Sequence, residues 1–214
     1  MLEIKETETT ILVTVASIRA QGIGGALIVL FSAFMAISEM TNNNLEEEMM
    51  IAHNKLGSYS NWYQSKSIKQ NLKESELHYL ETLILTNKTE NNLLPSLRTK
   101  IKNTKKLILK YEAEKTEILV GSANVPREYW AQDLDGKMGA IIGVKEWWVI
   151  TDEYTIATKK FDLAMLFFQI SIILGVVSII IQSYYKLQRT FIILMTLLGL
   201  IGTLVSIYGY ILAP

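Results

Sequence analysis

The chain has 214 residues, half of them hydrophobic, and its 21 lysines and arginines balance its 21 aspartates and glutamates. This balance removes any bulk attraction to nucleic acid. The absence of cysteine excludes disulfides, thiolate metal sites and thiol catalysis, and only two histidines, His53 and His78, are available for acid–base chemistry or metal binding.

The first long apolar block covers residues 22–41 and reads GIGGALIVLFSAFMAISEMT. About 20 residues at a rise of 1.5 Å span the roughly 30 Å hydrocarbon core of a bilayer. The only charged residue, Glu39, lies near the end of the block, so we predict a first transmembrane helix here. Residues 1–21 carry three glutamates, unlike the basic leader of a signal peptide, and their apolar stretch favours a short interfacial helix.

A water-facing helical hairpin is predicted over residues 42–120. In its first half, apolar and aromatic residues recur at alternating spacings of four and three, the pattern of a coiled-coil seam. These residues are Leu45, Met49, Ala52, Leu56, Tyr59 and Tyr63. The polar segment 86–95 ends in proline and predicts the turn at the tip, from which a helix returns to about residue 120.

The returning helix carries a basic face opposite its apolar seam. The members of this face lie within about a third of the helical circumference. They are Arg98, Lys102, Lys105, Lys106 and Lys110. The face is either a solvated surface or a docking surface for an acidic partner or lipid headgroups. No aromatic residues interleave with it, so nucleic acid is not expected as a partner.

The remaining chain is expected to return to the membrane and cross it twice more. Residues 121–160 contain four glycines and three of the four tryptophans and are predicted to be irregular. Apolar blocks at 161–183 and 191–213 predict a transmembrane hairpin, because backbone groups in lipid must bond within a helix. The predicted fold is therefore all-α, with three transmembrane helices and an extended, coiled-coil-like helical hairpin inserted between the first and second.

The second and third predicted transmembrane helices each carry a stripe of small residues. The stripes are Ala164, Ser171, Gly175 and Ser178 on the second, and Thr196, Gly199, Thr203 and Ser206 on the third. Small residues allow helices to approach closely in lipid, so we expect these two helices to pack together. The alternative is that the hydroxyl groups of Ser171, Ser178, Thr196 and Thr203 line a path across the membrane in an oligomer.

The positions of the basic residues predict the orientation. Short segments rich in lysine and arginine remain in the cytoplasm. The N-terminal segment and the link 184–190 carry Lys5, Arg19, Lys186 and Arg189, and three crossings place both segments on one side. We therefore expect these segments to be cytoplasmic and residues 42–160 to be extracytoplasmic.

The densest polar and aromatic pattern is SNWYQSKSIKQ, at residues 60–70. It resembles the signature WAYYQAKSIKQ of a bacterial and archaeal membrane-protein family, domain of unknown function 4337. The matching positions are Trp62, Tyr63, Gln64, Lys66, Ser67, Ile68, Lys69 and Gln70. The resemblance implies a multi-pass protein of a prokaryotic cell membrane, with one crossing, the signature, a coiled-coil hairpin and a closing pair of crossings. It implies no activity.

These features predict a protein without enzymatic activity and without a cofactor. We expect a membrane scaffold or accessory subunit that forms a homo-oligomer, or docks to a larger membrane complex, through its hairpin. One alternative is a small channel or transport-associated protein. Another is a copper-handling accessory protein, because Met49, Met50 and His53 share a helical face and could bind Cu(I), although a buried seam explains the same residues.

Overall fold

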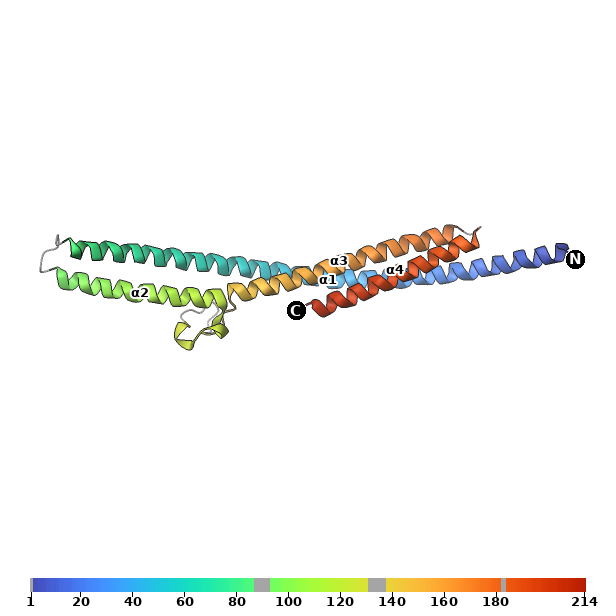
Figure 1. Ribbon diagram of the computed structural model, residues 1–214. Coiled ribbons are helices and arrows are strands. Elements are labelled where there is room, and N and C mark those ends of the chain that lie inside the picture. The colour runs from blue at the N-terminus through green and yellow to red at the C-terminus, as the bar shows by residue number, and fades with distance from the viewer. Residues whose placement is uncertain (1, 87–92, 131–137, 182–183) are drawn as a thin grey trace. The chain divides into compact units, whose positions relative to one another are not determined.

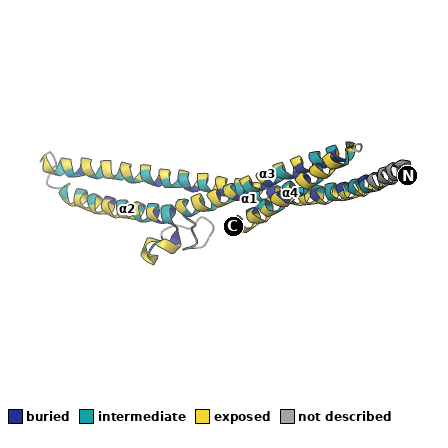
Figure 2. Cartoon of the chain, turned by 45° about the vertical axis from the view of Figure 1, so that its right-hand side comes forward, coloured by how far each residue is buried: buried dark blue, intermediate teal, exposed yellow. Residues whose placement is uncertain are grey.

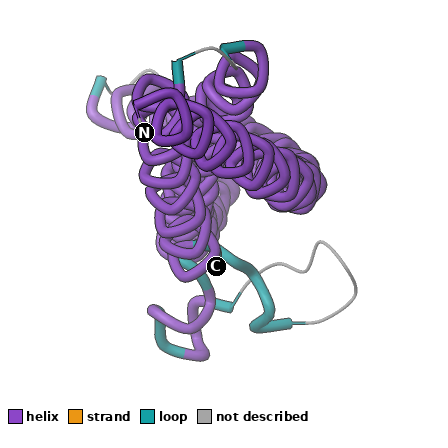
Figure 3. The backbone as a smooth tube through the Cα atoms, turned by 90° about the vertical axis from the view of Figure 1, so that its right-hand side faces the viewer, coloured by secondary structure: helices purple, strands orange, loops and turns teal. Residues whose placement is uncertain are grey.

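The computed structural model describes residues 2–86, 93–130, 138–181 and 184–214, with side chains from residue 15 onward. Over these residues it contains α1 (Leu2–Leu85), α2 (Leu94–Val120), α3 (Val144–Ile180) and α4 (Tyr185–Leu212), with short 3-10 turns at Ser122–Asn124 and Arg127–Tyr129 (Figure 1). Figure 3 shows helices and loops and no strand in this described part. The all-α prediction is confirmed for it.

Three of the helices, α1, α3 and α4, are long and apolar enough to cross a membrane. The chain divides into two compact units. The apolar unit comprises Met1–Met49 and Asp152–Pro214, and the hairpin unit comprises Met50–Thr151. Helices α1 and α3 each contribute to both units.

In the apolar unit, α1 and α4 run parallel with a constant register. Phe31 of α1 packs against Gly199 of α4, and a 2.8 Å hydrogen bond joins the hydroxyl groups of Ser38 and Ser206. Both pairs are separated by 168 residues, since 199 − 31 and 206 − 38 are equal. This offset is a multiple of seven, so the two helices present the same heptad positions to each other.

Helix α3 packs antiparallel to both partners. Its Phe168 lies against Gly202 of α4, and its Phe161 lies against Gly209. The Ser171 hydroxyl donates a 2.8 Å hydrogen bond to the backbone carbonyl of Met195. Four residues contributed by all three helices are fully or almost fully buried. This core consists of Phe31, Ala164, Phe168 and Met195.

The ends of several elements differ from the sequence-based prediction. Helix α1 begins at Leu2, so the expected interfacial segment 1–21 is the first part of a longer helix from that residue on. Helix α2 begins at Leu94, with Pro95 in its first turn, where a missing N–H is tolerated. Part of the predicted tip, residues 87–92, lies outside the described residues.

The segment predicted to be irregular, residues 121–160, is helical from Val144 onward. The backbone N–H of Gly143 donates to the Glu146 carboxylate at 2.9 Å, and the N–H of Trp147 donates to the Gly143 carbonyl at 2.9 Å. A glutamate that reaches back to the residue before the helix stabilises a helix start, so α3 begins much earlier than its apolar block.

Because Gly199 is closely packed, we predict that even an alanine there destabilises the chain. A methyl group at this position would overlap the Phe31 ring, which is almost fully buried, whereas a methyl group at Gly22 would meet nothing within 4 Å. Gly199→Ala should destabilise the full chain in mild detergent by about 1–3 kcal/mol, the usual effect of overpacking. Gly22→Ala should leave the melting temperature unchanged or raise it slightly. Equal melting temperatures for the two variants would contradict the described packing.

Candidate functional site

The signature motif lies where α1 runs alongside α2 in the hairpin unit (Figure 1). The motif residues divide between two sides of the helix. Trp62, Tyr63, Lys66 and Gln70 lie on the side towards α2 and the adjoining loop, and Lys66 is the most deeply buried of them. This spacing of three and four places them on one inward stripe.

The other motif residues point elsewhere. Gln64, Ile68 and Lys69 are exposed, and Ser67 is half-buried between the two sides. Packing within the chain therefore explains only the inward part of the motif. The outward part contributes to a surface described below.

An ion pair between Lys66 and Glu114 forms the centre of the inward stripe. The Lys66 ammonium lies 2.6 Å from the Glu114 carboxylate, and the two residues are only 7 % and 0 % exposed. The second carboxylate oxygen of Glu114 lies 3.7 Å from the Lys110 ammonium, and the Lys66 ammonium lies 5.7 Å from the centre of the Tyr111 ring. Removing both charges from water opposes folding. Once the pair is buried, loss of Glu114 would leave the Lys66 ammonium without this carboxylate, and loss of Lys66 would leave Glu114 with the more distant Lys110 ammonium.

More polar contacts follow the pair towards the tip. Lys115 donates a 3.0 Å hydrogen bond to the Gln70 side-chain oxygen and lies 5.6 Å from the centre of the Tyr63 ring. The Gln70 amide in turn donates to Glu74 at 2.8 Å. The hairpin thus joins its two helices by polar contacts as well as by apolar packing, and these contacts select one alignment of the helices.

Partly exposed ion pairs continue beyond the motif, both within α1 and between α1 and α2. Lys73 lies 2.7 Å from Glu76, and its hydrogen bond holds the pKa of the Glu76 carboxyl below the usual range while raising the pKa of Lys73 itself. Lys100 of α2 reaches the same carboxylate at 3.4 Å. Such exposed pairs contribute little to stability individually, but they agree with the register that the buried pair selects.

A compact loop closes the base of the hairpin. The Ser122 hydroxyl donates to Glu117 at 2.7 Å and accepts from the backbone N–H of Ile141 at 2.9 Å. Gly121 has a φ of 87°, a conformation that favours glycine, and the backbone at Gly143 packs directly against it. The loop therefore anchors the end of α2 next to the start of α3.

Aromatic residues pack beside this loop. The Tyr59 ring centre lies 6.0 Å from that of Trp62 and 6.3 Å from that of Trp147. These rings surround the buried side chains of Ile118 and Ile141. Trp147 is thus part of the hairpin core, whereas its neighbour Trp148 is largely exposed.

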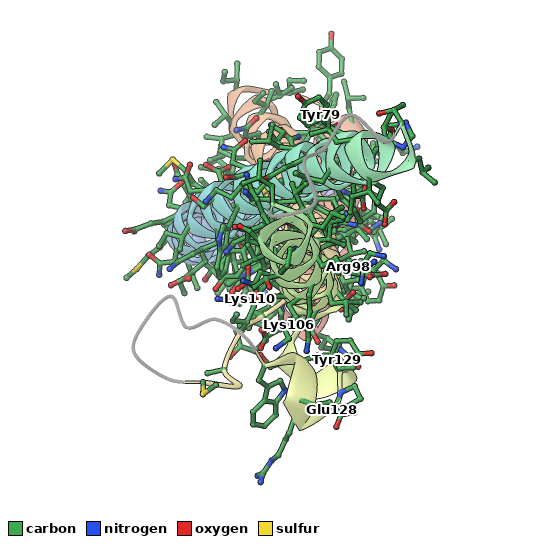
Figure 4. The ribbon with its side chains drawn as sticks, turned by 90° about the vertical axis from the view of Figure 1, so that its left-hand side faces the viewer. Tyr79, Arg98, Lys106, Lys110, Glu128 and Tyr129 are labelled. Atoms are coloured by element: carbon green, nitrogen blue, oxygen red, sulfur yellow. The ribbon has the colours of Figure 1, made fainter. Side chains whose placement is uncertain are left out.

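The predicted basic face of α2 is only partly free of acidic partners. Lys105 lies 2.9 Å from Glu81 of α1, and Lys110 contacts Glu114. Arg98, Lys102 and Lys106 are exposed and take part in no ion pair among the described residues. Figure 4 shows Arg98, Lys106 and Lys110 around the side of α2 that faces away from α1.

The small-residue stripes lie at contacts within the apolar unit. Ala164, Ser171, Gly175 and Ser178 are buried, and Thr196, Thr203 and Ser206 are half-buried around buried Gly199. The hydroxyl groups proposed to line a permeation path all donate to backbone carbonyls, at 2.7–2.9 Å. They belong to Ser171, Ser178, Thr196 and Thr203.

The residues considered for copper do not share one environment. The Met49 sulfur accepts a hydrogen bond from the Thr155 hydroxyl at 3.5 Å, whereas Met50 and His53 are exposed. Among the residues that the structure describes, no group of three histidine, aspartate or glutamate side chains could hold a metal ion.

Sequence reasoning missed the outer face of α1 in the hairpin unit. Nine exposed residues follow one another along it at spacings of three and four, and none of them is charged. They are Met50, Asn54, Gly57, Asn61, Gln64, Ile68, Leu72, Ser75 and Tyr79. Four of them are large, strongly exposed hydrophobic residues: Met50 (59 %), Ile68 (68 %), Leu72 (66 %) and Tyr79 (63 %). We call these nine residues the uncharged face; Figure 2 shows exposed residues along α1, and Figure 4 shows Tyr79 pointing away from α2.

Comparison with known proteins gives one result. A family model matches residues 21–212, which cover nearly the whole chain, and the family is described as a domain of unknown function (DUF4337). No curated protein and no solved structure matches the chain.

Because the ion pair is buried, we predict that removing one partner destabilises the hairpin more than removing both. Lys66→Met should lower the unfolding free energy of the hairpin unit by about 3 kcal/mol, near the lower end for buried pairs, because Lys110 still lies close to Glu114. The double variant Lys66→Met/Glu114→Met should recover most of this loss. All four tryptophans lie in the hairpin unit, so their fluorescence during denaturation of the full chain in detergent reports on it.

Lys69→Met is the matched control for this measurement. Lys69 lies in the same motif but is exposed, so its substitution should change the unfolding free energy by less than about 0.5 kcal/mol. Equal losses for Lys66→Met and Lys69→Met would show that the ion pair does not stabilise the hairpin.

Proposed function

The chain belongs to the family of the domain of unknown function DUF4337. We propose that it is a non-enzymatic membrane scaffold that self-associates through the uncharged face of α1. The observation that carries the proposal is the absence of charge from nine exposed positions that follow one side of α1 at spacings of three and four, in a chain whose residues are 20 % charged.

The uncharged face has the chemistry of a helix-packing surface. From Met50 to Tyr79 it follows α1 for about 45 Å at 1.5 Å per residue. Ile68, Leu72 and Tyr79 provide apolar contact area, and Gly57 provides a point of close approach, because a methyl group there would meet nothing within 4 Å. Glycine in a helix interior costs about 1 kcal/mol relative to alanine, and no contact within the chain offsets this cost at Gly57.

A second copy of the chain suits this face better than an unrelated partner. Chains anchored in one bilayer with the same orientation stand parallel, so identical positions of two α1 helices come opposite each other. Any charged residue on the face would then meet its own like charge, which is unfavourable. A face with no charge avoids this repulsion at every position, whereas an unlike partner could have used opposite charges.

The opposite side of the hairpin, formed by α2, is positively charged. Arg98, Lys102 and Lys106 of α2 are exposed at spacings of four and lack acidic partners among the described residues. Two copies facing each other through this side would repel. The charge distribution therefore favours an assembly with α1 inside and α2 outside, in which the basic side remains in water.

The proposed orientation follows from the basic residues beside the apolar blocks. Residues 184–190 and the N-terminal segment would face the cytoplasm, and the hairpin would lie outside it. Ser17 near the start of the first apolar block and Gln188 near the start of the last are joined by a 3.0 Å hydrogen bond, in agreement with a common side for these two segments.

Substitution on the uncharged face tests self-association. The wild-type protein extracted in mild detergent should have at least twice the 24.3 kDa mass of the chain. The double variant Ile68→Lys/Leu72→Lys should weaken association at least tenfold and yield monomer mass by light scattering, because like charges would oppose each other in the interface. Leu109→Lys is the matched control: Leu109 is 66 % exposed on α2, and its substitution should leave the mass unchanged.

Two outcomes of this experiment would overturn the proposal. A wild-type chain that is monomeric and bound to another protein would indicate docking to a larger complex instead. Equal dissociation by the α1 and α2 substitutions would show that the uncharged face is not the interface.

The chain contains no cysteine, so a single introduced cysteine can test the same interface in membranes. Gln64→Cys on the uncharged face should form an intermolecular disulfide on mild oxidation. Lys106→Cys on the basic side should not. Crosslinking of Lys106→Cys with none at Gln64→Cys would place α2 in the interface.

The same variants test the orientation. In intact cells, Lys106→Cys should react with a membrane-impermeant maleimide, whereas Lys186→Cys should react only after the cells are permeabilised. The reverse labelling pattern would place the hairpin in the cytoplasm.

A further inference from the structure

A groove between α1 and α4 lies at one end of the apolar unit. It has a volume of about 480 Å³ and is lined by Arg19 of α1 and by Tyr185 and Arg189 of α4. The rest of its lining is apolar, including Val15, Ile23 and Ile192. The two arginines belong to helices whose apolar stretches begin within a few residues of them.

A hydrogen bond between neighbouring side chains of α1 and α4 places the two arginines at about the same level. The Ser17 hydroxyl donates a 3.0 Å hydrogen bond to the Gln188 side chain, and both residues are buried. Arg19 follows Ser17 by two residues, and Arg189 follows Gln188 directly. Gly24 lies about two turns after Ser17 in α1, and a methyl group there would lie 3.9 Å from Ile192 of α4, so the two helices are also close at that level.

The positive charge of this groove has no internal partner among the residues whose side chains the structure describes. Neither Arg19 nor Arg189 takes part in an ion pair there. The acidic residues that are described in the apolar unit lie towards the other ends of its helices, beginning at Glu39 in α1 and ending at Asp162 in α3. The two arginines line one groove, and among the side chains that the structure describes no carboxylate balances their double positive charge.

We propose that this groove binds the phosphate of an anionic phospholipid, with Arg19 and Arg189 on the phosphate and one acyl chain along the wall formed by Ile23 and Ile192. Guanidinium groups bind phosphate oxygens through paired hydrogen bonds, and basic pockets between transmembrane helices suit anionic headgroups. Tyr185 has the amphipathic ring that sits at the headgroup level of a bilayer. A free anion would use the arginines but would leave the apolar wall uncovered.

The lipid site is independent of the uncharged face. Its residues all belong to the apolar unit, whereas the uncharged face belongs entirely to the hairpin unit. Either proposal can therefore fail without the other, provided that particle mass and lipid binding are measured on the same samples.

The test uses the full chain, purified in mild detergent and delipidated. Phosphatidylglycerol should raise its melting temperature in a saturable manner and should remain bound in native mass spectrometry. The variant Arg19→Gln/Arg189→Gln should bind phosphatidylglycerol at least tenfold more weakly. Arg98→Gln/Lys102→Gln removes the same charge from exposed residues of α2 and should bind it as the wild type does.

Two further ligands test whether binding requires both the negative charge of the headgroup and the acyl chain. Phosphatidylcholine should bind at least tenfold more weakly than phosphatidylglycerol, because its headgroup has no net charge. Inorganic phosphate at the same concentration should produce no shift, because it cannot cover the apolar wall. A shift with inorganic phosphate equal to that with the lipid would overturn the proposal in favour of a free anion, and equal binding of the two lipids would overturn it in favour of apolar contact alone.

A conservative variant distinguishes loss of the binding site from misfolding of the protein. Arg19→Lys/Arg189→Lys keeps both charges and should retain more phosphatidylglycerol binding than the glutamine variant, while its helix content by circular dichroism matches the wild type. If both double variants are folded and bind the lipid as tightly as the wild type, the arginines do not form the site.

Discussion

Every seventh side chain of α1 from Ser17 to Leu80 lies on the buried or half-buried side of the helix. A heptad repeat keeps one side of a helix towards its partners only if no residue is inserted or removed along its length. The rest of the structure depends on this constraint, because α1 supplies residues to both compact units. Within each unit, the register determines which side chains of α1 meet α2, α3 or α4, and it also determines which remain outside.

The same register is filled by different chemistry in the two units. In the apolar unit, its positions include Gly24, Phe31 and Ser38, and the opposing helices contribute glycine and serine, so the backbones approach closely. Lipid is as apolar as leucine, so close packing rather than the hydrophobic effect favours helix association there. In the hairpin unit, Tyr59 and Lys66 occupy the corresponding positions, and aromatic area and a buried ion pair replace the small residues. The polar pair suits a helix surface in water, because two purely apolar seams could shift in register at a small cost in free energy.

The sequence predicts the elements better than it predicts their contacts. The spacing of hydrophobic residues and the length of the apolar blocks alone identified the helical class and three apolar helices, because both signals are local. The partner of Lys66 was missed, since Glu114 is 48 residues away and charge at a seam position shows only that some partner is needed. A clue existed in α2, where Glu114 and Glu117 interrupt the apolar seam. The early start of α3 could also have been recognised, because Glu146 follows Gly143 by the three residues typical of a helix start.

The sequence of the signature motif alone does not show which of its residues contact α2 and which are exposed. Its inward residues are required by α2, and its outward residues are required by nothing within the chain. The two sets are interleaved, because neighbouring residues of a helix point in different directions. Only the structure separates them, since burial distinguishes Lys66 from Lys69 although both are lysines of one short segment.

The buried carboxylates of the hairpin align its elements. Glu114 lies between Lys66 and Lys110, and Glu117 accepts a hydrogen bond from Ser122, which in turn accepts one from the backbone N–H of Ile141 in the loop. Both glutamates are fully buried and directed at groups that join α2 to its neighbours. These two glutamates fix the alignment of α1, α2 and the closing loop. The side of α1 that this alignment places against α2 carries Lys66, and the uncharged face lies on the exposed side of the same helix.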